Sequence, residues 1–261
     1  MQMTIGQYFP GNSPLHRMDP RAKILCTIAL IVGVFASSNL WAYALLFAFM
    51  FATIRVSRIG MRFIVKGLKP ILFIVIFTFA INMFFTVDGE VLYAWRFIHI
   101  TDRGVRSAAL MALRLVLLVM TTQLLTLCTT SIELTDGIEA LLKPLSRVGF
   151  PAHELAMMMS IAMRFIPTLL EETDKIIKAQ MARGAEFEGG SLIQRARAML
   201  PLLVPLFVSA FRRADELALA MEARCYRGGQ GRTRMKRLRF TRLDAIGSAA
   251  TLAAVVAAAI L

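Results

Sequence analysis

The sequence has little charge for its length. Charged residues make up 18% of the 261 residues, and apolar residues (AVILMFWYC) make up 57%. A soluble domain typically has about 25% charged residues and about 45–50% apolar residues. This balance argues against a soluble enzyme and predicts an integral membrane protein.

The three cysteines and three histidines form no recognisable chemical pattern. An odd number of cysteines in unrelated segments argues against a disulfide framework, and the histidines stand too far apart to form a helical ligand pair. The sequence has no Gly-x4-Gly-Lys-[Ser/Thr] loop for nucleotide phosphates, and no nucleophile, base and acid group together. The chain is therefore predicted to be no enzyme and to bind no metal or cofactor itself.

Long apolar runs are what the sequence does have. A helix that crosses the hydrocarbon core needs about 20 residues, so the shorter runs need flanking basic residues that reach the interface. The pattern predicts an all-α integral membrane protein with about five transmembrane helices. The runs are residues 24–38, 40–54, 70–87, 107–130 and 245–261.

The loops between these runs predict the orientation, because Lys and Arg accumulate on the cytoplasmic side. Residues 55–69 hold five basic residues and no acid, whereas residues 88–106 hold equal numbers of both. We therefore expect the N-terminus, residues 55–69 and the long segment 131–243 to be cytoplasmic. The basic residues also recur every three or four positions, which predicts a helix lying at the interface. They are Arg55, Arg58, Arg62, Lys66 and Lys69.

The chain is predicted to have three parts: a membrane domain with four spans (1–130), a cytoplasmic domain of amphipathic helices (131–243) and a final transmembrane helix (244–261). Thr130 and Glu133 have the spacing of a capping box, which predicts a short helix that ends at Pro144. Two longer amphipathic helices follow, and they end near Gly184 and Gly228.

The two long helices end in similar triplets, Ala182-Arg183-Gly184 and Ala223-Arg224-Cys225, which are 41 residues apart. One interpretation is that each arginine complements the dipole of its own helix, an interaction worth about 0.3–1 kcal/mol. The other is that each guanidinium offers its fork of donors to another protein. The repetition at two equivalent positions favours the second.

A basic segment precedes the final apolar run. Near an anionic leaflet each basic residue contributes about 1 kcal/mol, so the segment can hold the cytoplasmic domain against the lipid bilayer. Aromatic residues are sparse there, and we expect no binding of nucleic acid. The segment consists of Arg232, Arg234, Lys236, Arg237, Arg239 and Arg242.

The spans lack the carboxylates that ion-driven carriers usually hold in the membrane. None of the five apolar runs contains Asp or Glu, and Arg114 is their only strong charge. Either snorkelling or a contact with a partner explains Arg114. The chain therefore looks like a subunit that takes its energy from another chain. A self-sufficient channel or carrier and a conventional ABC permease subunit stay open as alternatives.

Several motifs resemble the transmembrane T component of energy-coupling factor transporters, which are ABC-type importers of vitamins and trace nutrients. The resemblance covers nearly the whole chain. Its motifs are Gly6-Gln7-Tyr8 with Ser13, Leu15 to Arg17, Asp19 to Lys23, Gly137 to Pro144, Met159 to Pro167, Ala182-Arg183-Gly184 and Met221 to Arg224.

The resemblance implies that Arg183 and Arg224 dock into grooves of two cytosolic ABC ATPases. Ala182, Gly184 and Ala223 would then be close-approach neighbours, whereas Cys225 departs from the usual Gly or Ser. ATP and Mg are expected in those ATPases.

The resemblance also implies a membrane-embedded S component that captures the substrate, and a location in the prokaryotic cell membrane. Methionine-rich surfaces repack readily against different partners. The residues expected to face the S component are Met157, Met158, Met159, Met163, Leu203 and Phe207.

Overall fold

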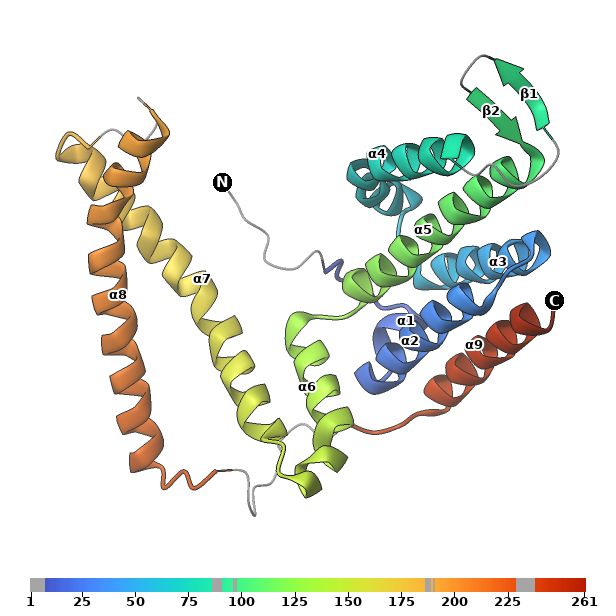
Figure 1. The fold of residues 1–261 in the computed structure, drawn as a ribbon. Helices are drawn as coiled ribbons and strands as arrows, with labels where there is room; N and C mark the ends of the chain where they lie inside the picture. The colour runs from blue at the N-terminus through green and yellow to red at the C-terminus, as the bar shows by residue number, and fades with distance from the viewer. Residues whose placement is uncertain (1–7, 86–90, 96–97, 186–188, 190, 229–237) are drawn as a thin grey trace. The chain divides into compact units, whose positions relative to one another are not determined.

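The computed structural model describes residues 8–85, 91–95, 98–185, 189, 191–228 and 238–261. The predicted all-α class is confirmed (Figure 1), and a two-stranded hairpin is added to it. The basic residues predicted at 232–237 lie outside the described part. In order, the elements are α1 (Pro14–Arg17), α2 (Pro20–Ala36), α3 (Leu40–Ser57), α4 (Met61–Phe85), β1 (Val91–Trp95), β2 (Ile98–Thr101), α5 (Asp102–Cys128), α6 (Ser131–Leu142), η1 (Lys143–Val148), α7 (Ala152–Ala182), α8 (Leu192–Ala223) and α9 (Arg242–Ile260).

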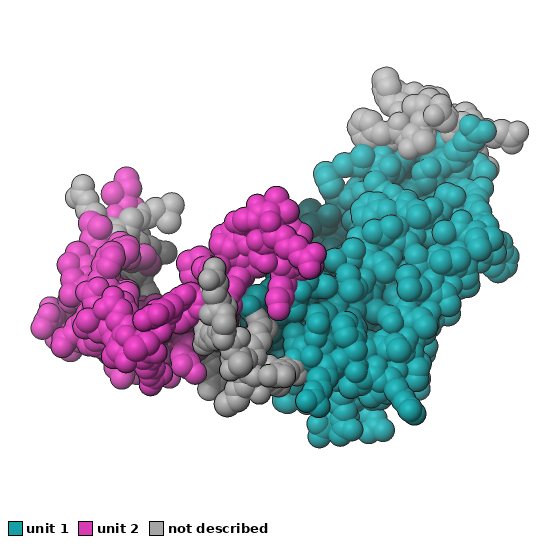
Figure 2. Space-filling view, turned by 90° about the horizontal axis from the view of Figure 1, so that it is seen from below, with its two compact units in different colours: residues 1–141, 236–261 teal, residues 142–235 magenta. Residues whose placement is uncertain are grey.

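The chain forms two compact units, which are coloured separately in Figure 2. The first, here called the bundle, comprises residues 1–141 and 236–261. The second, residues 142–235, contains η1 and the two long helices α7 and α8.

Among the residues that the structure describes, four helices of the bundle are long and apolar enough to cross a membrane: Leu40–Ser57, Met61–Phe84, Asp102–Cys128 and Arg242–Ile260. They correspond to four of the five predicted spans. The remaining one, α2, has 17 residues and a length of about 26 Å, against about 30 Å for the hydrocarbon core. It packs against α5 and α9 within the same bundle.

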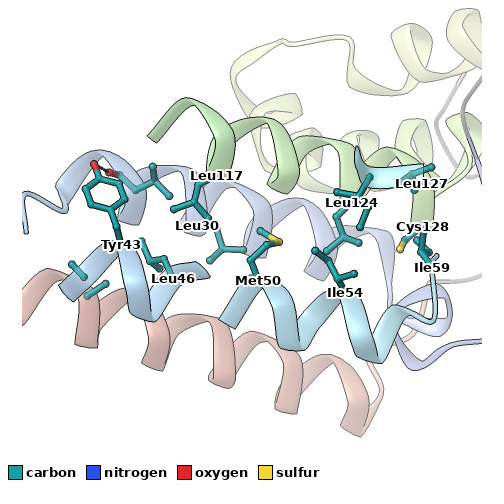
Figure 3. Packing of buried hydrophobic residues seen from close by; sticks show 14 residues of the cluster. Leu30, Tyr43, Leu46, Met50, Ile54, Ile59, Leu117, Leu124, Leu127 and Cys128 are labelled. Atoms are coloured by element: carbon teal, nitrogen blue, oxygen red, sulfur yellow. Dashed lines mark hydrogen bonds between the residues drawn. The ribbon is translucent and has the colours of Figure 1, made fainter. Parts of the chain in front are cut away.

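The core of the bundle lies between α2, α3 and α5. Tyr43, Leu46, Met50 and Ile54 recur every three or four positions along α3, so they share one face of that helix. All four are buried, and they meet side chains of α2 and α5, as Figure 3 shows. On the far side of α2, a Cβ at Gly33 would lie 2.9 Å from both methyl carbons of Val255, so glycine is needed where α9 approaches.

Arg114 has its contacts inside the bundle, at the end where α2 turns into α3. Its Nε donates to the Tyr43 hydroxyl at 3.0 Å, and its guanidinium lies 5.5 Å from the centre of the Phe35 ring. The Tyr43 hydroxyl in turn donates to the carbonyls of Val34 and Ser37. The only strong charge of the predicted spans therefore ties α5 to the turn between α2 and α3.

The opposite end of the bundle is held by buried charged groups. Lys23 Nζ donates to the carbonyl oxygens of His16 (3.2 Å) and Cys128 (3.0 Å). Asp244 accepts from the Asp19 backbone N–H at 2.7 Å, and it forms a capping box with Thr241. These bonds join the start of α2 to the end of α5 and the start of α9.

The predicted interfacial helix over residues 55–69 is wrong. Arg58 adopts a left-handed conformation (φ 56°) and ends α3, and the Ile59 N–H bonds the Ser57 hydroxyl at 3.3 Å instead of continuing the helix. Arg62, Lys66 and Lys69 belong to α4, which begins at Met61 and continues through Pro70. Spacing alone could not reveal the break at Arg58.

The segment between α4 and α5 was expected to be a loop, but it holds the antiparallel strands β1 and β2. Its β-branched and aromatic residues favour strands. Thr101 ends β2 and caps α5, because its hydroxyl accepts from the Gly104 N–H at 3.1 Å.

Candidate docking site on the two long helices

Helices α7 and α8 pack against each other and run in opposite directions (Figure 1). One carboxylate joins them near the middle: Glu172 accepts from the Ser209 hydroxyl at 2.5 Å and from the Arg213 guanidinium at 2.9 Å. These two donors hold the pKa of Glu172 below its usual range, with Ser209 the larger cause. The contact fixes where the helices cross.

Helix α7 ends in a Schellman motif, in which two backbone N–H groups bond back to the last turn. The Gly184 N–H bonds the Met181 carbonyl, and the Ala185 N–H bonds the Gln180 carbonyl, both at 3.0 Å. Gly184 has φ +89°, and apart from Gly184 itself and its two neighbours in the chain, no described residue has an atom within 4 Å of where its Cβ would be. Backbone conformation alone therefore explains the glycine after Arg183 within this chain.

Helix α8 ends in the same motif. The Cys225 N–H bonds the Glu222 carbonyl at 2.8 Å, and the Tyr226 N–H bonds the Met221 carbonyl at 3.0 Å. Cys225 occupies the position of Gly184 and also has positive φ, 55°. A left-handed non-glycine residue costs about 1–2 kcal/mol, so the end of α8 is strained where the end of α7 is not.

Both motifs place an arginine at the C-cap, and both arginines are exposed. Within the part of the chain that the structure describes, the guanidinium groups of Arg183 and Arg224 form no hydrogen bond or ion pair, although the backbone N–H of each bonds a carbonyl of its own helix. The flanking Ala182 and Ala223 are exposed as well. Each helix end therefore presents a free guanidinium with only a methyl group before it.

The helix pair has an approximate internal symmetry. Glu172 and Arg213, which form the ion pair, are 41 residues apart, as are Arg183 and Arg224. Arg183 therefore lies 11 positions after Glu172 on α7, and Arg224 lies 11 positions after Arg213 on α8, a distance of about 16 Å along each helix. Arg183 and Arg224 are here called the arginine tips. Because the helices are antiparallel, the two tips lie at opposite ends of the pair. The arrangement offers two similar sites rather than one combined site.

The predicted apolar surface is exposed in part. Met158, Met159, Leu203 and Phe207 are exposed, whereas Met157 and Met163 are half-buried. A longer apolar stripe runs along α8, with a spacing of four, three and four residues, and only Phe207 of it is among the residues predicted to face the S component. This stripe comprises Leu200, Val204, Phe207 and Phe211, of which Phe211 is 69% exposed.

The described residues contain no candidate metal-binding site, because no three His, Cys, Asp or Glu side chains among them are grouped so that they could hold an ion. The features that the α7–α8 pair offers are therefore surface features: two arginine tips and an apolar stripe. Such a surface is suited to binding other proteins.

Comparison with known proteins identifies close relatives. The family described as cobalt transport protein (CbiQ) matches residues 11–235. Three proteins named energy-coupling factor transporter transmembrane protein EcfT are similar over nearly their whole length. That of Ruminiclostridium cellulolyticum is 58% identical over 244 residues, 94% of this chain and 91% of the relative. That of Thermosediminibacter oceani is 55% identical over 250 residues (96% and 94%), and that of Bacillus subtilis is 50% identical over 242 (93% and 91%).

Proposed function

Because this chain belongs to the family of energy-coupling factor transporter transmembrane proteins, we propose that it couples two cytosolic ABC ATPases to a separate S component in the membrane. The S component captures a vitamin or other micronutrient, and this chain transmits the motion that drives uptake. ATP and Mg bind in the ATPases, and this chain catalyses no reaction.

The two arginine tips are the proposed ATPase-docking sites, and their matching geometry is the observation that carries this assignment. The C-caps Arg183 and Arg224 share one backbone motif and are exposed. A guanidinium fork binds carboxylates and backbone carbonyls at the end of a groove, and the alanine before it lets the partner's backbone come close. Two similar tips at opposite ends of a helix pair fit two similar ATPase subunits.

The crossing of α7 and α8 gives a route for the motion. If the two ATPases approach each other on binding ATP, they displace the tips together, and each tip acts on a helix arm of about 16 Å beyond the Glu172–Arg213 pair. The helices then pivot where they are joined. Their apolar stripe moves with them, and with it the S component that we place on that surface.

The S component is proposed to cover the exposed apolar residues of the two helices. Met158 and Met159 on α7 and Leu203 and Phe207 on α8 are 46–60% exposed. Methionine and phenylalanine fill irregular gaps, which suits a surface that releases and rebinds a partner.

The proposed location is the prokaryotic cell membrane, crossed several times, with the N-terminus in the cytoplasm. The basic residues at 55–69 support this orientation. It puts α7 and α8 on the side where ATPases reside.

The test is assembly. The double variant Arg183→Glu/Arg224→Glu, expressed with both ATPases and an S component, is expected to lose at least about tenfold in ATPase co-purification, because each buried interfacial arginine is worth about 2 kcal/mol or more. The matched control is Lys178→Glu/Arg212→Glu, which makes the same charge change at exposed positions on the same two helices. The control should assemble normally. Normal assembly of the first variant would contradict the docking assignment.

A further inference from the structure

The bundle contains an apolar groove of about 300 Å³. It lies between α2, α3, α5 and α9. Its walls include Leu30, Met50, Val56, Leu124, Ile246 and Ala250.

The polar side chains in the groove are already used by the protein. Each of its four threonine hydroxyls donates at 2.8 Å to the carbonyl four residues earlier in its own helix. They are Thr27, Thr53, Thr121 and Thr251. Lys23 is likewise bonded to two backbone carbonyls.

Water is therefore a poor occupant of the groove. A buried water needs two to four polar partners, whereas an apolar cavity of about 150 Å³ stays dry and binds benzene. This groove has about twice that volume, so a flexible hydrocarbon chain fits it better than any polar ligand.

The groove is accessible from the lipid. Ala52 and Val56 on α3 and Ile246 and Ala250 on α9 line it and are exposed at its rim. Both helices are long and apolar enough to span the membrane. The hydrocarbon that surrounds the protein can enter between them without crossing a polar barrier.

Two arginines are close in sequence to residues that line one end of the groove, although neither arginine lines it. Arg55 directly precedes Val56, and its guanidinium lies 5.2 Å from the centre of the Phe51 ring. Arg242 lies one helical turn before Ile246, so it shares that residue's face of α9. Neither has an ion-pair partner in the described part of the chain, and a guanidinium binds phosphate oxygens in pairs.

We propose that this groove binds one acyl chain of an anionic phospholipid, whose phosphate is held by Arg55 and Arg242. The site is independent of ATPase docking. It places an ordered lipid between α3 and α9, at the end of the bundle where Asp244 and Lys23 join the helices.

The experiment uses phosphatidylglycerol with a diazirine in one acyl chain, added to the protein in nanodiscs, with crosslinks mapped by mass spectrometry. Crosslinks are expected on peptides that line the groove. Ala250→Phe fills the groove and should lower their yield about tenfold. Ala249→Phe, at the neighbouring exposed alanine outside the groove, should not. Equal labelling of both variants would show general lipid contact and overturn the proposal. Ala52→Phe repeats the test from the opposite wall.

The headgroup is tested separately. Arg55→Gln/Arg242→Gln should remove the preference for the phosphatidylglycerol probe over a phosphatidylcholine probe with the same acyl chain. If the unsubstituted protein labels equally with both probes, the phosphate contact is wrong.

Discussion

The bundle and the α7–α8 pair use charged residues in opposite ways. In the bundle, Asp19, Lys23 and Asp244 are at most 6% exposed, and each is hydrogen-bonded to its own chain. In the helix pair, Arg183 and Arg224 are exposed, and no partner for their guanidinium groups lies among the described residues. Buried charges must be paired because an uncompensated charge in a protein interior costs several kcal/mol.

This difference separates charges that build the fold from charges that are available for another molecule. Both kinds occur at helix ends and look alike in sequence. If the comparison is correct, removing a charge from the bundle lowers stability, whereas removing one from a helix tip leaves stability unchanged and affects binding.

The largest effect is expected from Asp244→Ala. Its carboxylate accepts three hydrogen bonds, from the Asp19 N–H and from the backbone and hydroxyl of Thr241, at 2.6–2.8 Å. Losing them should destabilise the bundle by about 3 kcal/mol, because hydrogen bonds to charged groups contribute about 1.5–3 kcal/mol each and are not additive. Thermal unfolding in detergent measures this. Asp215→Ala, at an exposed position of α8, should change stability by less than about 0.5 kcal/mol.

Two substitutions to methionine sharpen the contrast. Lys23→Met leaves the carbonyls of His16 and Cys128 without their donor and should cost about 1–3 kcal/mol. Arg224→Met removes an exposed group and should cost less than about 0.5 kcal/mol, while weakening ATPase co-purification. Thermal unfolding and co-purification of both variants give the two readouts. Equal stability of the two variants would break the comparison.

The sequence predicted what depends on local pattern. The membrane class, four spans and the ends of both long helices agree with the structure, and the matching relatives confirm the T component. The capping box at Thr130 and Glu133 is confirmed by both of its hydrogen bonds, at 3.4 and 3.2 Å. In each case neighbouring residues in the chain determine the structure.

Features that depend on distant contacts or on one backbone angle were not predictable. The bond from Arg114 to Tyr43 joins residues 71 positions apart. The break at Arg58 and the common motif at Gly184 and Cys225 depend on a positive φ at single residues. Composition and periodicity carry no signal for a left-handed arginine or cysteine.

Exchanging the residues that follow the two tips tests the common motif. Gly184→Cys should destabilise the end of α7 by about 1 kcal/mol, and Cys225→Gly should stabilise the end of α8 by up to about 1 kcal/mol, because only glycine adopts positive φ without strain. Hydrogen exchange of the amides of Ala185 and Tyr226, which close the motifs, measures both effects. Changes of the same sign in the two variants would show that the ends are not equivalent.

The smallest effect is expected from acidification of the Glu172 contact. Ser209 and Arg213 lower the pKa of Glu172 in the folded protein, so its stabilising effect is fully present above the unfolded value of about 4.3. That effect is lost as the pH falls below this value and through the lower folded pKa. Spin labels at exposed Lys178 and Phe207 should report an unchanged distance from pH 7 to about pH 5 and a broader distance distribution near pH 3.

Glu172→Gln should show the broader distance distribution already at pH 7, whereas Glu216→Gln, whose partner Arg212 lies on the same helix, should not. A distribution that is insensitive to pH in the unsubstituted protein would mean that apolar packing alone holds the crossing. The pivot that we propose between the two tips would then not depend on this ion pair.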